Sequence, residues 1–526
     1  MTHTTPVLRL TILATLLLCA GCAVGPDFQR PDAPTGQRLT REPVSATAGV
    51  AVATGTRQTF EVGAQVQRDW WTLYASPTLN ELVELALNKN PTIEAAQASL
   101  KQAQAMATSQ RGFYFPNVQV GYAPLRQGDS NTLSPTLNSG DTPFTLNTAQ
   151  VSVGFTPDVF GLNRRTVESL DAQAENQKFQ LDAASVTLAT NVVSAAIAQA
   201  ALRAQINATE DIIRASSRSL DLLRAQAKIG FASGLDVAAQ ETALAQAEQT
   251  LPPLHKQLEQ TRNLIAVLAG KLPSEGGLEN FDLDALQLPA TLPVSLPSQI
   301  VDQRPDVRAA EATLHAASAA VGVSIAQRLP QFSLTAFFGG AAVPFNDMFN
   351  SSNQFWGVTG NLAQTVFDFG TLKYRQVAAE AGMAQAGAQY RSTVLTAFQN
   401  VADTLTALDA DAKSLAAAVK AENAARKTYE LTQQQLKIGA VNALAMLLAD
   451  QAYQQTSITR IQAQASRLTD TAALFQSLGG GWSVPTVPTV QTVPTAQTTQ
   501  AVQTVPTTQA LQTVQTIQTA PTVQTN

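Results

Sequence analysis

Two long stretches of the chain carry apolar residues at helical spacing and contain no proline. The first lies between Gly161 and Gly230, and the second between Gly370 and Gly439. Apolar positions in the first include Val167, Leu170, Leu181, Val192, Ile197, Ile206, Ile213 and Leu220, and those in the second include Val377, Val394, Phe398, Leu405, Leu408 and Leu415. This pattern predicts two helices of about 68 residues, each about 100 Å long at about 1.5 Å per residue. Helices of that length need coiled-coil support.

A glycine closes each long helix, and a second helix follows it. Gly230 and Gly439 stand where a C-terminal cap is expected, each preceded by Lys-Ile. Helical spacing resumes a few residues later, over about Leu235–Gly270 in the first case and Asn442–Leu478 in the second. The pattern therefore predicts two helical hairpins.

The chain consists of two copies of one unit, 90–270 and 304–478. Asn90-Pro91 opens a helical segment that reaches Phe115-Pro116, and Arg304-Pro305 opens another that reaches Leu329-Pro330 after the same number of positions. The interval from Phe-Gly to Lys-Ile-Gly is also identical in the two units. We expect each short proline-initiated helix to stack end to end with a returning hairpin helix, beside the long one. Residues 22–89 and 271–303 flank and join the units.

Strands are expected where the helices stop. Apolar and polar residues alternate over 117–123, 149–155, 331–338 and 355–369, and polar loops join each pair. One interpretation is an ordinary half-buried sheet of a soluble domain. The other is membrane insertion, in which four strands are too few to close a barrel, so several chains would have to share one.

The N-terminus has the features of a lipoprotein signal. A short apolar run, Leu10–Leu18, is followed by Ala20-Gly21-Cys22, which predicts a signal peptide over 1–21 and acylation of Cys22. Both cysteines, Cys19 and Cys22, lie here, so the rest of the chain has no disulfide framework or cysteine metal site. Residues 479–526 end in an uncharged Val-Pro-Thr and Val-Gln-Thr array for which we expect disorder.

Composition narrows the function classes further. Charged residues make up 14% of the chain and the formal net charge is -5, with no basic block, so nucleic acid is not an expected partner. Beyond the N-terminus no run approaches 18 consecutive apolar residues, so no helical membrane span is expected.

No pattern of catalytic, cofactor-binding or metal-ligating residues emerges. His255 and His315 stand alone on predicted helices, and surface or packing roles are expected for both. Arg164-Arg165, at a strand-to-helix junction, is interpreted as a solvated interfacial anchor. We therefore expect a protein that is not an enzyme and needs no cofactor or metal.

Several motifs together resemble a known family. They are the start Cys22-Ala-Val-Gly25-Pro26-Asp27-Phe28, the pair Trp70-Trp71, the segment Ser76-Pro77-Thr-Leu79-Asn80, and Arg304-Pro305-Asp306-Val307-Arg308. Over residues 22–480 the chain resembles the TolC-like outer-membrane factors of the NodT branch, which are efflux lipoproteins.

The resemblance implies a mainly α fold with a small β part. It implies a homotrimer whose strands form a 12-stranded outer-membrane barrel, continued by a long periplasmic α-helical barrel. The implied role is a passive duct for small molecules. The partners would be outer-membrane lipid, a periplasmic adaptor and an inner-membrane pump of the resistance-nodulation-division class. The adaptor would meet the hairpin tips, at Lys228, Gly230, Ser233, Gly234, Lys437, Gly439 and Asn442.

The sequence departs from the family pattern at the periplasmic aperture. The resemblance leads us to expect carboxylates just after the second hairpin turn, but Ala445 and Leu448 stand there. Asp450 lies two residues further on, which turns it to another face of a helix. An apolar constriction is therefore the hypothesis. Two rival functions are a type I protein secretion duct and a non-conducting coiled-coil spacer or adhesin.

Overall fold

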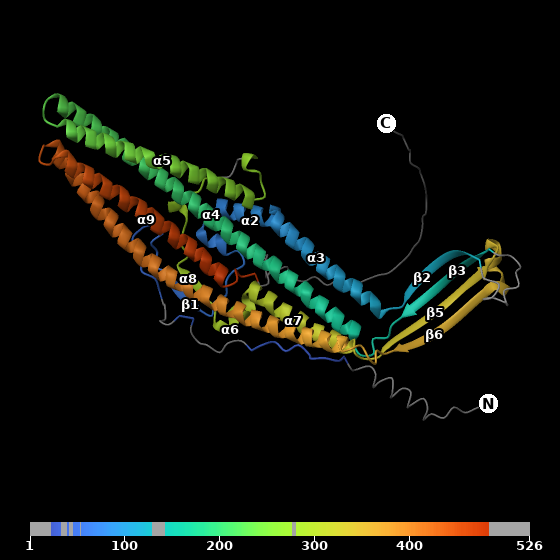
Figure 1. Ribbon diagram of the computed structural model, residues 1–526. Helices are drawn as coiled ribbons and strands as arrows, with labels where there is room; N and C mark the ends of the chain where they lie inside the picture. The colour runs from blue at the N-terminus through green and yellow to red at the C-terminus, as the bar shows by residue number, and fades with distance from the viewer. Residues whose placement is uncertain are drawn as a thin grey trace, which may run out of the picture. The chain divides into compact units, whose positions relative to one another are not determined.

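The computed structural model describes residues 23–32, 39–40, 46–52, 54–128, 143–275 and 280–482. The predicted signal peptide, the predicted lipidation site Cys22 and the tail from residue 483 lie outside the described residues. The described part is mostly helical with a small strand part, which confirms the coarse fold class predicted from the sequence (Figure 1).

Two very long helices run through the described part, as predicted. They are α4 (Leu162–Lys228) and α8 (Thr371–Lys437), of 67 residues each. Each starts directly after a glycine with a left-handed backbone, Gly161 at φ +78° and Gly370 at φ +88°. Each returns as a hairpin, through α5 (Gly234–Leu268) after α4 and α9 (Ala443–Ser477) after α8.

Beside each long helix lie two shorter helices, stacked end to end. The helices α3 (Pro91–Arg111) and α5 both pack on α4, while α7 (Pro305–Ala326) and α9 both pack on α8. The helices α7 and α9 also contact α4, so the two units share one core (Figure 1). Two further helices, α2 (Pro77–Lys89) and α6 (Pro297–Gln303), precede α3 and α7.

The joint between stacked helices has the same design in both units. In the first, the Asn90 side chain accepts a hydrogen bond from Thr92 N at 2.8 Å and donates one to the Leu268 carbonyl, at the end of α5, at 2.9 Å. In the second, Arg304 Nη1 donates to the Ser477 carbonyl, at the end of α9, at 2.7 Å. The residue before each proline therefore connects the start of one short helix to the end of the other.

The four predicted strands form one antiparallel sheet in the order β2-β3-β5-β6. They are β2 (Asn117–Gln127), β3 (Phe144–Phe155), β5 (Gln331–Ala342) and β6 (Gln354–Ala363). The prediction that the last strand reaches Phe369 is wrong. The Asp368 carboxylate accepts hydrogen bonds from Gly370 N at 2.9 Å and Leu372 N at 2.7 Å, which makes a turn into α8 instead.

A second, smaller sheet was not predicted. The strands β1 (Thr59–Val62) and β4 (Thr291–Val294) pair in parallel, joining the segments that flank the first unit. Beside them lies an aromatic core in which Trp70 stacks on Phe475 of α9 with ring centroids 5.1 Å apart. The Tyr74 hydroxyl donates to the Leu468 carbonyl at 2.8 Å. These contacts tie the N-terminal segment to the second hairpin.

Two helices, α4 and α7, are long and apolar enough over a window of 18 residues to cross a membrane by length and composition. In each, 56% of that window is buried against the rest of the chain. Burial of this extent is what a core helix of a packed domain shows, so we assign both helices to the core.

Candidate functional sites at the hairpin tips, the groove, the sheet and the anchor

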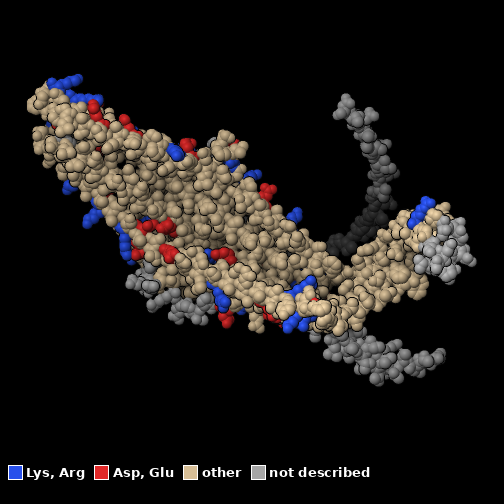
Figure 2. All heavy atoms as spheres, in the orientation of Figure 1, with Lys and Arg blue, Asp and Glu red and all other residues tan. Residues whose placement is uncertain are grey.

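All seven residues predicted at the hairpin tips are exposed at the turns of the two hairpins. These are Lys228, Gly230, Ser233, Gly234, Lys437, Gly439 and Asn442. Gly230 and Gly439 adopt φ values of +82° and +75°, which glycine takes without strain. Basic side chains are visible at this end of the molecule (Figure 2).

Polar caps fix the geometry of each tip. The Ser233 hydroxyl accepts from Asp236 N at 3.1 Å, and the Asp236 carboxylate accepts from Ser233 N at 3.0 Å, which is a capping box. In the second tip the Asn442 side chain accepts from Ala445 N at 3.0 Å. Exposed apolar side chains accompany the caps, Ile229 and Phe231 in the first tip and Ile438 in the second. The tips are therefore capped turns with exposed apolar and basic side chains.

The first two turns of α9 present leucines outward. Leu444 and Leu448 are both exposed, 54% and 58% respectively, and Ala445 is half-buried. Asp450 is only 5% exposed, and its carboxylate accepts from the Ser216 hydroxyl of α4 at 2.8 Å and from Gln454 at 3.1 Å. Burial raises the pKa of Asp450 above its usual value. Asp450 thus faces α4, as its spacing from Leu448 indicates.

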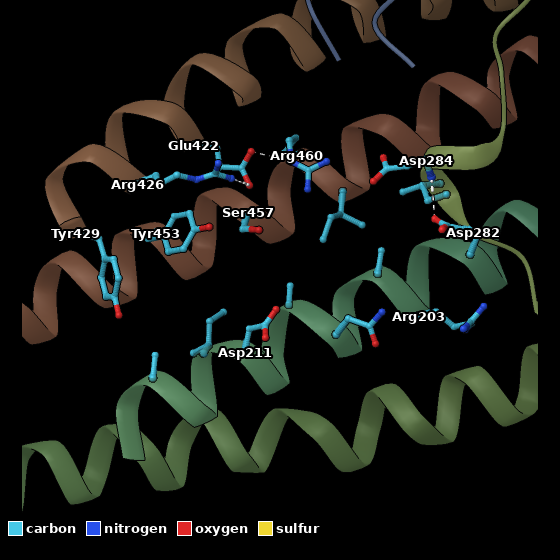
Figure 3. A pocket seen from close by; sticks show the side chains of 18 of the residues that line it. Arg203, Asp211, Asp282, Asp284, Glu422, Arg426, Tyr429, Tyr453, Ser457 and Arg460 are labelled. Atoms are coloured by element: carbon cyan, nitrogen blue, oxygen red, sulfur yellow. Dashed lines mark hydrogen bonds and ion pairs between the residues drawn. The ribbon is translucent and has the colours of Figure 1, made fainter. Parts of the chain in front are cut away.

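A groove lies between α4 and the second hairpin, close to Asp450 (Figure 3). Its volume is about 530 Å³, and the loop Phe281–Asp284 forms part of its wall. The buried Glu422 carboxylate of α8 forms ion pairs with two arginines. It lies 2.7 Å from Arg460 Nε of α9 and 3.8 Å from Arg426 Nη2. Tyr429 and Tyr453 stack beside them at 5.7 Å. This cluster was not predicted from the sequence, because its members come from separate helices and form no local motif.

The two faces of the four-stranded sheet differ sharply in polarity. The register aligns Val120, Val151, Phe338 and Trp356 in one row across the sheet. Val120 is 82% exposed and Trp356 76% exposed. The opposite face carries Gln119, Gln150, Ser152, Ser333, Thr335, Thr359 and Asn361. Within the four strands Arg126 is the one charged residue. An exposed apolar face with a polar reverse side suits a wall between lipid and water.

The residues that follow Cys22 dock where the sheet meets α4. Val24 N donates to the Phe160 carbonyl at 3.2 Å. Arg165 donates to the Val24 carbonyl at 3.1 Å and to the Asp27 carboxylate at 2.7 Å. Gly25 has φ +99°, and a Cβ there would lie 2.4 Å from the Gly322 Cα of α7. The Gly-Pro-Asp start is therefore a docking motif that needs its glycine.

The two histidines lie in surface and packing positions, as expected. Arg165 does not lie in the solvated position expected for it. His255 is exposed, and His315 packs by stacking on Phe28 at 4.4 Å while lying 3.0 Å from the Glu168 carboxylate. The interpretation of Arg165 as solvated is wrong, because it is 4% exposed and bonded to the docked N-terminal segment. No group of three or more potential metal ligands occurs among the described residues.

Comparisons with known proteins agree with this geometry. OpmQ of Pseudomonas putida, a pyoverdine export outer membrane protein, is 29% identical over 84% of this chain and 94% of its own length. TtgC of Pseudomonas putida, a toluene efflux pump outer membrane protein, is 28% identical over 90% of this chain and 95% of its own. The solved structure of the outer-membrane channel OprN is 27% identical with a TM-score of 0.77, covering 88% of this chain and 100% of that one.

A model of the outer membrane efflux protein family matches residues 82–271 and 296–480. These ranges include both stacked-helix units, the four strands of the large sheet and both hairpin tips. They make up well over half of the chain, so this protein belongs to the outer membrane efflux protein family and is an outer-membrane component of an efflux system.

Proposed function

We propose that three copies of this chain form a passive exit duct for small molecules, a barrel of twelve strands continued by a helical tunnel. The observation that carries this proposal is the four-stranded sheet with one exposed apolar face and one polar face. Among the described residues β2 and β6 are the edge strands of this sheet, and lipid does not tolerate open strand edges. Joining the edges of three chains removes them and gives a closed wall.

The proposed partners are inferred from the hairpin tips, which lie at the end of the molecule away from the large sheet (Figure 1). A periplasmic adaptor would contact the apolar and basic hairpin tips, and an inner-membrane pump of the resistance-nodulation-division class would supply the energy. The similarity to pyoverdine and toluene exporters supports small-molecule efflux over protein secretion. The paired amphipathic strands argue against a non-conducting spacer.

Acylation of Cys22 would anchor the chain beside its own barrel. Support comes from the docked segment, since Ala23 lies so close to Gly161 that a Cβ on that glycine would be 2.9 Å from the Ala23 Cβ. Gly161 stands between β3 and α4, at the level where the barrel would leave the membrane. An acyl chain on the preceding residue would reach the inner leaflet from there.

The sharpest test uses two neighbouring residues on opposite faces of β2. Val120→Arg places a charge toward lipid and should sharply reduce the amount of trimer in the outer membrane, because a lipid-facing Arg costs about 2–4 kcal/mol near the bilayer midplane. Gln119→Arg places it toward the lumen, so the trimer should insert and conduct in planar bilayers with selectivity shifted toward anions. The opposite pattern, or wild-type protein that never conducts, would refute the duct.

A substitution at Leu448 tests the proposed apolar constriction of the duct. Leu448→Ala should raise single-channel conductance and the leak of drugs into cells, because it removes an exposed apolar side chain from the first turns of α9. Ala443–Ser477 should stay helical in this variant, which circular dichroism would check. Unchanged conductance and leak would remove Leu448 from the gate.

A further inference from the structure

The polar face of the large sheet carries three phenylalanines, Phe144 at the end of β3 and a central pair, Phe337 and Phe355. One row of residues across this face runs Gln119, Ser152, Phe337 and Gly357. The next row runs Gly121, Gln150, Gly339 and Phe355. In each row a phenylalanine of one strand stands opposite a glycine of the other. Gln119 and Ser152 complete the first row, and Gln150 and Gly121 complete the second.

The glycines make room for the two rings. A Cβ on Gly357 would lie 2.5 Å from the Phe337 ring, and a Cβ on Gly339 would lie 2.8 Å from the Phe355 ring. Each ring therefore reaches across the strand boundary and lies over the backbone of the opposite glycine. The two ring centroids are 6.0 Å apart with an angle of 54° between the planes, so the rings form one continuous aromatic surface.

Polar residues lie beside this surface on β3 and toward the helical end of the sheet. Ser152 and Gln150 lie beside it on β3, and Thr335 and Thr359 lie beside it toward the periplasmic end. Both rings are half-buried, so part of each stays open to the space in front of the sheet. Covering a glycine with a ring also stabilises the strand pair, and the part of each ring that stays open is available to a solute.

We infer that Phe337 and Phe355 form a contact site for aromatic, apolar solutes on the inner wall of the duct. This inference rests on the proposed function, in which the polar face lines the lumen. Three chains would place six rings at one level of the barrel. Aromatic solutes would stack on the open ring surfaces and be retained there briefly, while small ions and aliphatic solutes would pass without this contact.

Channel block by two cations of equal charge tests the site. Tetraphenylphosphonium is aromatic and tetrabutylammonium is aliphatic, and each is added to single wild-type channels in a planar bilayer. The double variant Phe337→Leu, Phe355→Leu keeps apolar bulk above the glycines but removes both rings. It should shorten the dwell time of tetraphenylphosphonium about threefold to tenfold and leave that of tetrabutylammonium unchanged.

The matched control is Asn361→Thr, on the same face of β6 but nearer the periplasmic end, which should alter neither dwell time. Equal aromatic dwell times in wild type and the double variant would overturn the inference while leaving the duct intact. A wild-type protein without conductance would overturn the duct itself. If the double variant does not insert, the single Phe355→Leu channel decides, with a shortened aromatic dwell time supporting the site and an unchanged one refuting it.

Discussion

Single buried polar residues connect the segments around the middle of the helices. Arg467 of α9 is fully buried, and its guanidinium donates to the Thr56 carbonyl at 2.6 Å and the Thr47 hydroxyl at 3.1 Å. One side chain thus holds the N-terminal segment against the second hairpin. Close to it, the carboxyl group of Asp411 of α8 lies beside that of Asp470 of α9.

Because of this carboxyl pair, we expect the free energy of unfolding to depend on pH. Burial and the neighbouring carboxyl group of Asp470 raise the pKa of Asp411 from 3.8 to about 7. The folded protein therefore binds a proton that the unfolded chain has lost, and stability falls as pH rises from about 4 to about 7. Between pH 5.5 and 7.5 the loss should be about 1–2 kcal/mol, allowing for partial exposure.

Asp411→Asn should abolish most of that pH dependence, because an amide imitates the protonated acid. Thermal denaturation followed by circular dichroism at several pH values measures the effect. Asp403→Asn, an exposed carboxylate on the same helix, is the control and should retain the wild-type profile. A wild-type melting temperature that does not change over this range would contradict the assignment of a shared proton.

At the scale of elements, the regular parts were predictable and the connections between them were not. Helical spacing and the glycines at 161, 230, 370 and 439 give both long helices nearly to the residue, because a long periodic pattern averages out local exceptions. The pair β1 and β4 was missed, since an alternation of only four residues is too short to stand out as a periodic signal. Likewise, the orientation of Asp450 followed from spacing, but its partner Ser216 depends on how α4 packs against α9.

The joints between stacked helices lead to a prediction at this scale. Arg304 is buried, donates to the Ser477 carbonyl and pairs with the Asp306 carboxylate at 2.6 Å. Arg304→Leu leaves the end of α9 without this donor and should destabilise the second unit by about 2–4 kcal/mol. Limited proteolysis should then cut faster near residues 303 and 478. Arg328→Leu, which removes an exposed arginine, should not change the cleavage rate.

At the scale of the whole molecule, the N-terminal segment contacts the connection between β3 and α4 and both units. Asp27 and the Val24 carbonyl bind Arg165 of α4, while Phe28 stacks on His315 of α7. Arg30 extends the contact to the Glu311 carboxylate of α7 at 3.1 Å. A chain anchored by lipid at Cys22 would thereby be held against its own sheet, so lipid and strands would enter the membrane at one place.

Two adjacent arginines test this docking, because they differ in burial and in partners. Arg165 is nearly buried and bonds the docked segment, whereas Arg164 is 37% exposed in its side chain and lies 3.6 Å from the Asp158 carboxylate. Arg165→Met should release residues 23–28, raising amide exchange at Val24 at least tenfold, since about 1.4 kcal/mol of lost stability gives that factor. Arg164→Met should leave the exchange as in the wild type. Equal protection of Val24 in both variants would show that the contacts of Arg165 do not hold the N-terminus, and that Gly25 and Phe28 suffice to dock it.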